Sequence, residues 1–262
     1  MNKNDLNITL KRASWLVALF IAIAIVLSAV QQRESSLVEG VAVDIAPLQG
    51  GNTLIKPEDV KLTIERTFGT PIEGLPLSQI DVERIEEVLE EDPFVVNADA
   101  YVDSRSRVNV KIAQREPMLR IIDNNGLNYY LDADGNKMPL SKHFAARVLV
   151  ATGNLPPHDP LYFKPDSDRK NRLRDVFDLS HHLLADSFFK ALIEQIYVSN
   201  TGEFTLIPKV GDQKILFGHY NNVNEKLENL KIFYQEGMPY EGWQKYRTIN
   251  LKYKGQVVCE KR

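Results

Sequence analysis

The chain is poor in cysteine: its 262 residues include only one, Cys259. A single thiol cannot form a disulfide within its own chain, and it cannot supply the several thiolates of a cysteine-rich metal site. The composition therefore excludes a fold held together by internal disulfides. A lone cysteine remains compatible with an oxidising compartment.

The chain also lacks an excess of positive charge. It has 32 Lys and Arg residues against 35 Asp and Glu, which gives a formal net charge of −3 and a pI near 6.0. A protein that binds nucleic acid through phosphates needs a basic surface. The charge balance therefore argues against nucleic acid as a partner.

Motifs of common enzymes are missing as well. The sequence has no Gly-x-Ser-x-Gly elbow, no phosphate-binding glycine loop and no His-Glu-x-x-His zinc motif. Three scattered histidines, His143, His158 and His219, have no spaced partners. The neighbours His181 and His182 diverge by about 100 degrees on a helix, so they cannot easily chelate one ion. We predict no catalytic residue, no metal, no cofactor and no enzymatic activity.

The most distinctive feature that is present is an uncharged apolar run from Ala13 to Val30. As a helix rising about 1.5 Å per residue, these eighteen residues would extend roughly 27 Å. That length is close to the hydrocarbon thickness of a bilayer. The run predicts a single transmembrane helix at residues 13–30.

The charges before this run predict its orientation. Lys3, Lys11 and Arg12 precede it, and the positive-inside rule then keeps residues 1–12 in the cytoplasm as a short tail. A connector at residues 31–36 leads to the remainder of the chain on the far side, periplasmic or otherwise extracytoplasmic. A cleaved signal peptide is the alternative, but its only candidate cleavage site, Val26-Leu27-Ser28, is weak.

Residues 37–115 have the pattern of a small α/β module. A strand at Val41–Ile45 precedes a helix that starts at Pro57 and a second helix capped by Asp81. Two alternating segments then predict a hairpin. Its expected inward side chains are Val96, Ala98, Ala100, Val102, Val108, Val110 and Ile112. The order strand, helix, helix, strand, strand resembles a POTRA domain, and the resemblance implies a protein-binding module without chemistry of its own.

The second of these helices is strongly acidic. Its outer positions carry Glu83, Glu86, Glu87, Glu90 and Glu91. We interpret them as a solvated surface. Docking of a basic partner is one alternative, and the paired carboxylates of a wall-degrading hydrolase are another.

Residues 116–262 predict a mixed β-domain with flanking helices. Strands are expected near Tyr129–Leu131, Arg147–Ala151, Ile193–Ser199, Phe204–Pro208 and Gln213–Phe217, followed by a last pair at Thr248–Tyr253 and Gln256–Glu260. Amphipathic helices are expected around Leu173–Leu184 and Val223–Tyr234. The Asp132-Ala133-Asp134-Gly135 run invites a calcium site, but the glutamate of an EF-hand loop is Ser141 here, so we predict a hairpin turn. The fold class is therefore α+β.

Several short motifs together resemble one family. Gln114-Arg115-Glu116-Pro117 closes the POTRA-like module, and Tyr130–Gly135, Ile215–Gly218 and Ile249–Tyr253 follow in order. With the leading anchor they resemble the FtsQ/DivIB family of bacterial cell-division proteins. The family's usual glutamate is Gln114 here, and its Asp-Leu-Arg-Tyr reads Asn250-Leu251-Lys252-Tyr253.

This resemblance implies a bitopic, non-enzymatic scaffold at the division septum that helps control septal peptidoglycan synthesis. The implied partners are FtsB- and FtsL-like coiled-coil proteins, with other divisome membrane proteins bound through the POTRA-like domain. A POTRA-containing envelope secretion or assembly factor is the alternative. That class expects several POTRA modules in series.

The predicted partner surface is the last strand with the turn before it. A terminal strand that does not lie inside a sheet leaves unpaired N–H and C=O groups, which an added strand can satisfy. In the family this region receives a strand from the coiled-coil partner. The candidate residues are Tyr253, Gln256, Val257, Val258, Cys259 and Glu260. Alternation places Val257 and Cys259 on one face and the remaining strand residues on the other; the competing interpretation is that they are ordinary core residues.

Overall fold

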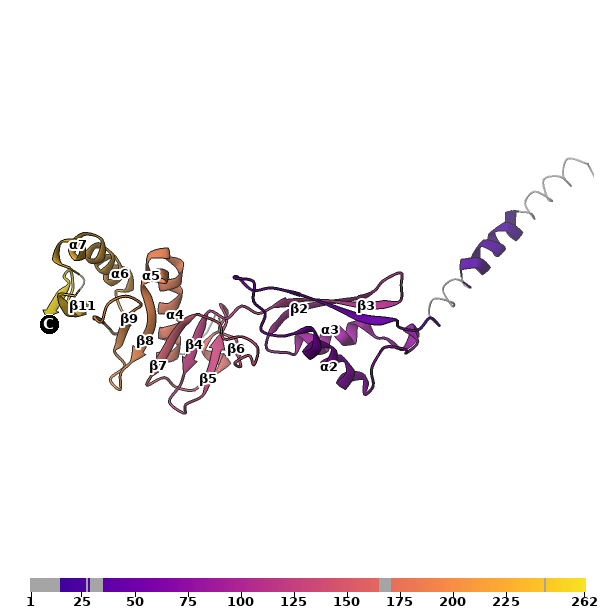
Figure 1. Ribbon diagram of the computed structural model, residues 1–262, viewed down its shortest axis with the longest axis horizontal. Helices are drawn as coiled ribbons and strands as arrows, with labels where there is room; N and C mark the ends of the chain where they lie inside the picture. The colour runs from indigo at the N-terminus through magenta and orange to yellow at the C-terminus, as the bar shows by residue number, and fades with distance from the viewer. Residues whose placement is uncertain (1–14, 27, 29–34, 165–170, 243) are drawn as a thin grey trace, which may run out of the picture. The chain divides into compact units, whose positions relative to one another are not determined.

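The computed structural model describes residues 15–26, 28, 35–164, 171–242 and 244–262 (Figure 1). It divides the chain into two compact units, Met1–Gln114 and Arg115–Arg262. Each unit has its own hydrophobic core.

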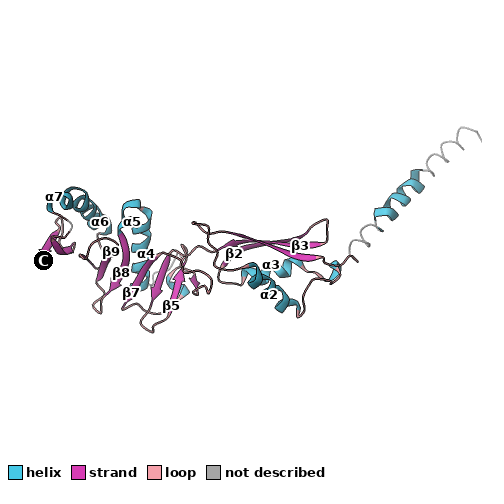
Figure 2. Ribbon diagram, in the orientation of Figure 1, coloured by secondary structure: helices cyan, strands magenta, loops and turns pink. Residues whose placement is uncertain are grey.

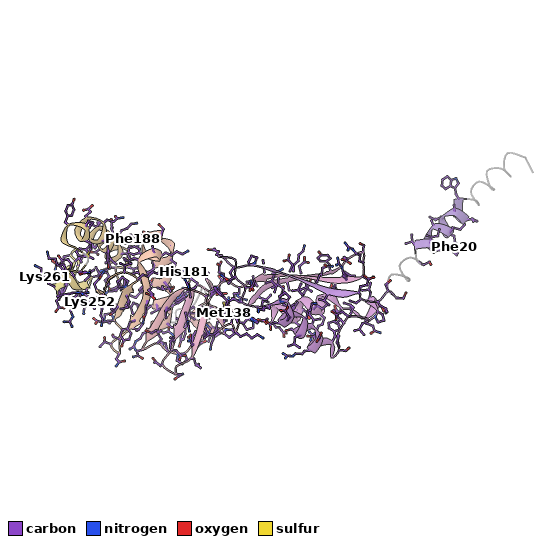
Figure 3. All side chains as sticks on the ribbon, viewed as in Figure 1. Phe20, Met138, His181, Phe188, Lys252 and Lys261 are labelled. Atoms are coloured by element: carbon purple, nitrogen blue, oxygen red, sulfur yellow. The ribbon has the colours of Figure 1, made fainter. Side chains whose placement is uncertain are left out.

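The described part of the apolar run is helical from Trp15 to Val26. Its large side chains are exposed, with Trp15 at 77% and Phe20, labelled in Figure 3, at 74%. Within the described ranges, no helix combines the length and apolar character needed to cross a membrane. The predicted tail at 1–12, the ends of the predicted span and positions 31–34 of the connector lie outside the described residues.

The N-terminal unit has the predicted order of elements. They are β1 (Gly40–Ala46), α2 (Pro57–Phe68), the 3₁₀ helix η1 (Leu77–Gln79), α3 (Val82–Glu90), β2 (Val95–Val102) and β3 (Arg107–Gln114). In the three-stranded sheet β3 is central, parallel to β1 and antiparallel to β2. Helices α2 and α3 lie on the same side of this sheet (Figure 2). The predicted α/β module is confirmed.

Local signals set the helix ends in this unit. Pro57 is the first residue of α2, and Gly69 ends that helix in a left-handed conformation with φ of 72°. A side chain would be strained there, so glycine suits the position. Helix α3 begins after Asp81, whose carboxylate accepts the backbone N–H of Arg84 at 3.0 Å.

One predicted core residue of this unit is wrong. Val96 is 56% exposed, whereas its neighbour Val95 is buried at 1%. The pairing of β2 with β3 shifts between Val95 and Asn97, and such an irregularity reverses which side chains face the core. From Ala98 onward the expected alternation holds.

The acidic face of α3 is more than a solvated surface. The Glu86 carboxylate accepts the backbone N–H of Ala100 at 2.6 Å, and the Glu90 carboxylate accepts that of Ala98 at 3.2 Å. Both donors belong to β2, the strand at one edge of the sheet. The interpretation of α3 as wholly solvated is therefore wrong for these two side chains.

Gln114 connects three parts of the N-terminal unit. Its Oε1 accepts the backbone N–H groups of Leu54, at 2.6 Å, and Ile55, at 3.4 Å, and its Nε2 donates to the Ala46 carbonyl at 2.8 Å. A glutamate could accept the two N–H groups but could not donate to Ala46. An amide therefore satisfies all three backbone groups, which gives a physical reason for Gln114 where the motif usually has an acid.

The C-terminal unit is built on one mixed sheet of nine strands in the order β12-β11-β10-β9-β8-β7-β4-β5-β6. Its strands are β4 (Leu119–Ile122), β5 (Asn128–Leu131), β6 (Lys137–Met138), β7 (Leu149–Gly153), β8 (Ile193–Val198), β9 (Phe204–Pro208), β10 (Lys214–Gly218), β11 (Tyr246–Asn250) and β12 (Val258–Lys261). Strands β8, β9 and β10 form the predicted antiparallel meander. The predicted mixed sheet is confirmed.

Helices flank this sheet (Figure 1). They are η2 (Pro160–Tyr162), α4 (Arg172–Ala185), α5 (Ser187–Leu192), α6 (Val223–Ile232), the π-helical turn η3 (Phe233–Gly237) and α7 (Met238–Glu241). The predicted buried face of α4 includes Leu173, Val176 and Leu183, each at most 1% exposed. The sequence did not predict α5, a short helix capped by Asp186.

The turn between β5 and β6 is organised by the buried Asp132. Its carboxylate accepts the N–H groups of Asp134, at 2.9 Å, and Asn136, at 2.8 Å, and the Asn136 side chain at 2.9 Å. The Arg115 guanidinium donates to it at 2.6 Å. Strands β5 and β6 are antiparallel, as the predicted hairpin requires. Among the described residues, no group of three or more acidic, His or Cys side chains could hold a metal ion.

Candidate protein-interaction site

The last strand of the chain lies at an edge of the nine-stranded sheet. Among the described strands, β12 pairs with β11 alone, in antiparallel register with Ile249 opposite Cys259 and Asn250 opposite Val258. It begins two residues later than predicted and ends at Lys261. Strand β11 stops at Asn250, so Gln256 and Val257 have no strand residue opposite them.

The side chains at this edge face two ways. Val257 and Cys259 are partly buried against the core, whereas Val258 is 41% exposed. Gln256 and Glu260 are exposed as well. The Glu260 carboxylate also accepts a hydrogen bond, at 3.3 Å, from the hydroxyl of Thr248 on β11. The face turned to solvent therefore combines an amide, an aliphatic and an acidic side chain.

The backbone of β12 also has two sides. In an antiparallel pair, alternate residues turn their N–H and C=O groups toward the partner strand, and those between turn them away. The N–H of Arg262 faces β11, because it donates to the Lys245 carbonyl at 3.1 Å. The irregularity in the pairing lies on β11, between Tyr246 and Thr248, so it leaves the alternation along β12 unchanged. Counting back along β12, we infer that the N–H groups of Cys259 and Lys261 point away from β11. No strand of the described residues pairs with that side.

The turn before β12 displays Tyr253, which is 52% exposed. Each end of the turn contacts an acid from a distant part of the sequence. The Lys252 ammonium lies 3.2 Å from the Glu203 carboxylate, and the backbone N–H of Gly255 donates to Glu225 at 3.0 Å. Sequence reasoning missed Glu203 and Glu225 because their partners lie far along the chain. The turn that carries the exposed Tyr253 is therefore fixed at both ends by these contacts.

The motif that ends in Gly218 packs against the same turn. Gly218 has φ of 78°, and a Cβ at this position would lie 2.9 Å from Cγ of Lys252. Glycine therefore allows the Lys252 side chain to cross the end of β10. Lys252 is labelled in Figure 3, together with Lys261 of β12.

A buried lysine supports the helix that carries Glu225. The Lys226 ammonium donates to the His219 carbonyl at 2.9 Å and to the Asn221 side chain at 2.7 Å, and it lies 4.7 Å from the centre of the Phe217 ring. Burial lowers the pKa of Lys226 below its usual value. These contacts fix the loop between β10 and α6.

Cys259 and His158 are two partly buried titratable groups of this unit. Burial raises the pKa of the Cys259 thiol, which keeps it protonated at neutral pH and a poor nucleophile. His158 stacks on Phe163, and its Nε2 lies 2.9 Å from the Gly135 carbonyl. Burial lowers the pKa of His158. The arrangement around β12 offers backbone groups, an aliphatic side chain and an aromatic ring, which are the elements of a protein-binding surface.

Two family models match the chain. One, described as FtsQ/DivIB, C-terminal related, matches residues 116–260, and the other, described as a POTRA-like domain, matches residues 38–113. No curated protein matches the chain.

Proposed function

The chain belongs to the FtsQ/DivIB family, which makes it a cell-division protein, and from this premise we propose that it is a scaffold of the divisome. The family is one of non-enzymatic division proteins. In this proposal the chain acts at the division septum by binding other division proteins, and thereby helps control septal peptidoglycan synthesis.

We propose that residues 13–30 anchor the chain in the cytoplasmic membrane. Support comes from the exposed apolar side chains of the helix Trp15–Val26, which have no protein core to cover them. The basic residues before this run favour a cytoplasmic N-terminus. The two folded units then lie on the extracytoplasmic side, where the cell wall is built.

The proposed main partner is an FtsB- or FtsL-like coiled-coil protein, which adds a strand to β12. The observation that carries this proposal is the position of β12 at the edge of the sheet, with the N–H groups of Cys259 and Lys261 directed away from β11. An added strand would satisfy these groups, and its side chains would contact Val258 and Tyr253. Other divisome membrane proteins are proposed to bind the POTRA-like domain.

Tyr253 provides a test of this function. We expect Tyr253→Ala to weaken binding of the FtsB-like partner about 30-fold, because exposed tyrosines are frequent interface hot spots worth about 2 kcal/mol. The free energy of unfolding of the variant should change by less than about 0.5 kcal/mol, since Tyr253 is 52% exposed. Titration calorimetry and thermal unfolding measure the two effects.

Tyr240→Ala is the matched control for this test. Tyr240 is 90% exposed in the same unit but belongs to α7 rather than to the turn before β12. We expect it to bind the partner like the unmodified protein. Equal losses for the two variants, or none for Tyr253→Ala, would contradict the proposed surface.

A further inference from the structure

The two edges of the three-stranded sheet are protected to different degrees. At the β2 edge, Glu86 and Glu90 of α3 occupy the N–H groups of Ala100 and Ala98, and the pairing shifts between Val95 and Asn97. Charged side chains and bulges are devices by which proteins keep other strands from adding to an edge. The β2 edge is therefore closed.

The β1 edge has less protection, because Asp44 is the single charged side chain in Gly40–Ala46. Its residues Gly40–Ala46 pair with β3 in an unbroken register, and they include no lysine, no proline and no bulge. The chain covers only the residues before it: Val38 exchanges hydrogen bonds of 2.9 Å with Leu75 and Gly74. Beyond Val38, no strand in the described part of the chain pairs with β1 on the side away from β3.

The apolar side of β1 is incompletely covered. Val41, Val43 and Ile45 face the core but remain partly exposed. The side chains opposite them on β3, namely Val108, Val110 and Ile112, are only 0%, 1% and 2% exposed. An additional strand with apolar side chains on the helix side would extend this core over the edge.

The other side of the sheet supplies a charge preference. Lys111 on β3 lies opposite Asp44 on β1 and opposite Asp99 on β2. Both aspartates are exposed. A basic residue on a strand added beside β1 would face Asp44, and opposite charges on neighbouring strands are favourable.

We propose that the outer edge of β1 receives an extended segment of a partner protein, apolar toward the helices and carrying lysine or arginine opposite Asp44. This site extends the proposed scaffold function. It rests on that function, because the function is the reason for taking the occupant to be a protein. The site belongs to the N-terminal unit, whereas β12 belongs to the C-terminal unit. The closed β2 edge restricts the addition to one side of the sheet.

A synthetic peptide of alternating lysine and valine tests this site on the full chain in detergent micelles. At millimolar peptide we expect amide hydrogen exchange to slow in Val41–Ile45 and to stay unchanged in β2. A peptide with glutamate in place of lysine should bind at least several-fold more weakly. No slowing in β1, or equal binding of the acidic peptide, would overturn the proposal.

Two charge reversals form a matched pair for the same assay. Asp44→Lys should weaken binding of the basic peptide about fivefold, which is the order expected for a cross-strand charge pair. Asp99→Lys makes the same change opposite the same Lys111 but at the closed edge, so it should leave binding unchanged. Equal effects would overturn the assignment to β1. Binding of the proposed FtsB-like partner at β12 is measured in separate experiments. If those experiments fail, the peptide assay still tests the β1 edge.

Discussion

Replacing Cys259 with proline should weaken binding of the proposed FtsB-like partner at least about tenfold. Proline has no N–H, and its ring would project toward an incoming strand at the place where we infer an outward N–H. One backbone hydrogen bond contributes about 1 kcal/mol, and the clash adds to that loss. The C-terminal unit should remain folded, because proline is tolerated on edge strands when the missing N–H faces outward.

Cys259→Ala separates the backbone from the side chain in this experiment. It removes the same partly buried thiol but keeps the N–H. We expect this variant to bind within about twofold of the unmodified protein, because the N–H that is offered to the partner is kept. If the alanine variant lost as much binding as the proline variant, with both folded by circular dichroism, side-chain packing would be the cause and strand addition would be refuted.

Asp132→Asn should destabilise the C-terminal unit by about 3 kcal/mol, because it removes one partner of a largely buried ion pair. The Asp132 side chain is 7% exposed and that of Arg115 is 22% exposed. The asparagine would also place an amide hydrogen against groups that now donate to the carboxylate. Denaturant unfolding measures this change.

The same carboxylate makes stability depend on acid pH. Burial works to raise the pKa of Asp132, but hydrogen bonds from Asn136, from Arg115 and from two backbone N–H groups outweigh it and hold the pKa below its usual value. A carboxyl group whose pKa is lower in the folded state stabilises the fold above its unfolded pKa, which is about 3.9. Its contribution should be lost as the pH falls from there through the folded pKa, and Asp132→Asn should flatten that loss.

Asp134→Asn is the control for both effects. It removes the same charge from the same turn, but Asp134 is exposed. We expect a change in unfolding free energy of less than about 0.5 kcal/mol. A similar loss of stability for Asp134→Asn would show that the net charge of the turn, rather than the buried pair, stabilises it.

Features decided by neighbouring residues could be predicted from the sequence. Pro57 and Asp81 mark the starts of α2 and α3, and alternation identifies the strands of the hairpin and the meander. The pattern failed at Val96, because an irregular pairing depends on the opposite strand and leaves no local signal.

The candidate site was only partly predictable for the same reason. Alternation correctly separated the partly buried Val257 and Cys259 from the exposed Val258. The contacts of Lys252 with Glu203 and of Gly255 with Glu225 were not predictable, since these partners lie 49 and 30 residues apart in the sequence. Contacts at such separations follow from the order of strands in the sheet, which composition and periodicity do not determine.

The central claim, that β12 receives a strand from a division partner, is tested most directly by residue-resolved amide hydrogen exchange. The measurement compares the full chain alone with the chain saturated by the proposed FtsB-like partner. We expect the N–H groups of Cys259 and Lys261 to exchange much more slowly in the complex, whereas Val258 and Glu260, which face β11, change little. Unchanged exchange at Cys259 and Lys261 in a saturated complex would contradict the claim.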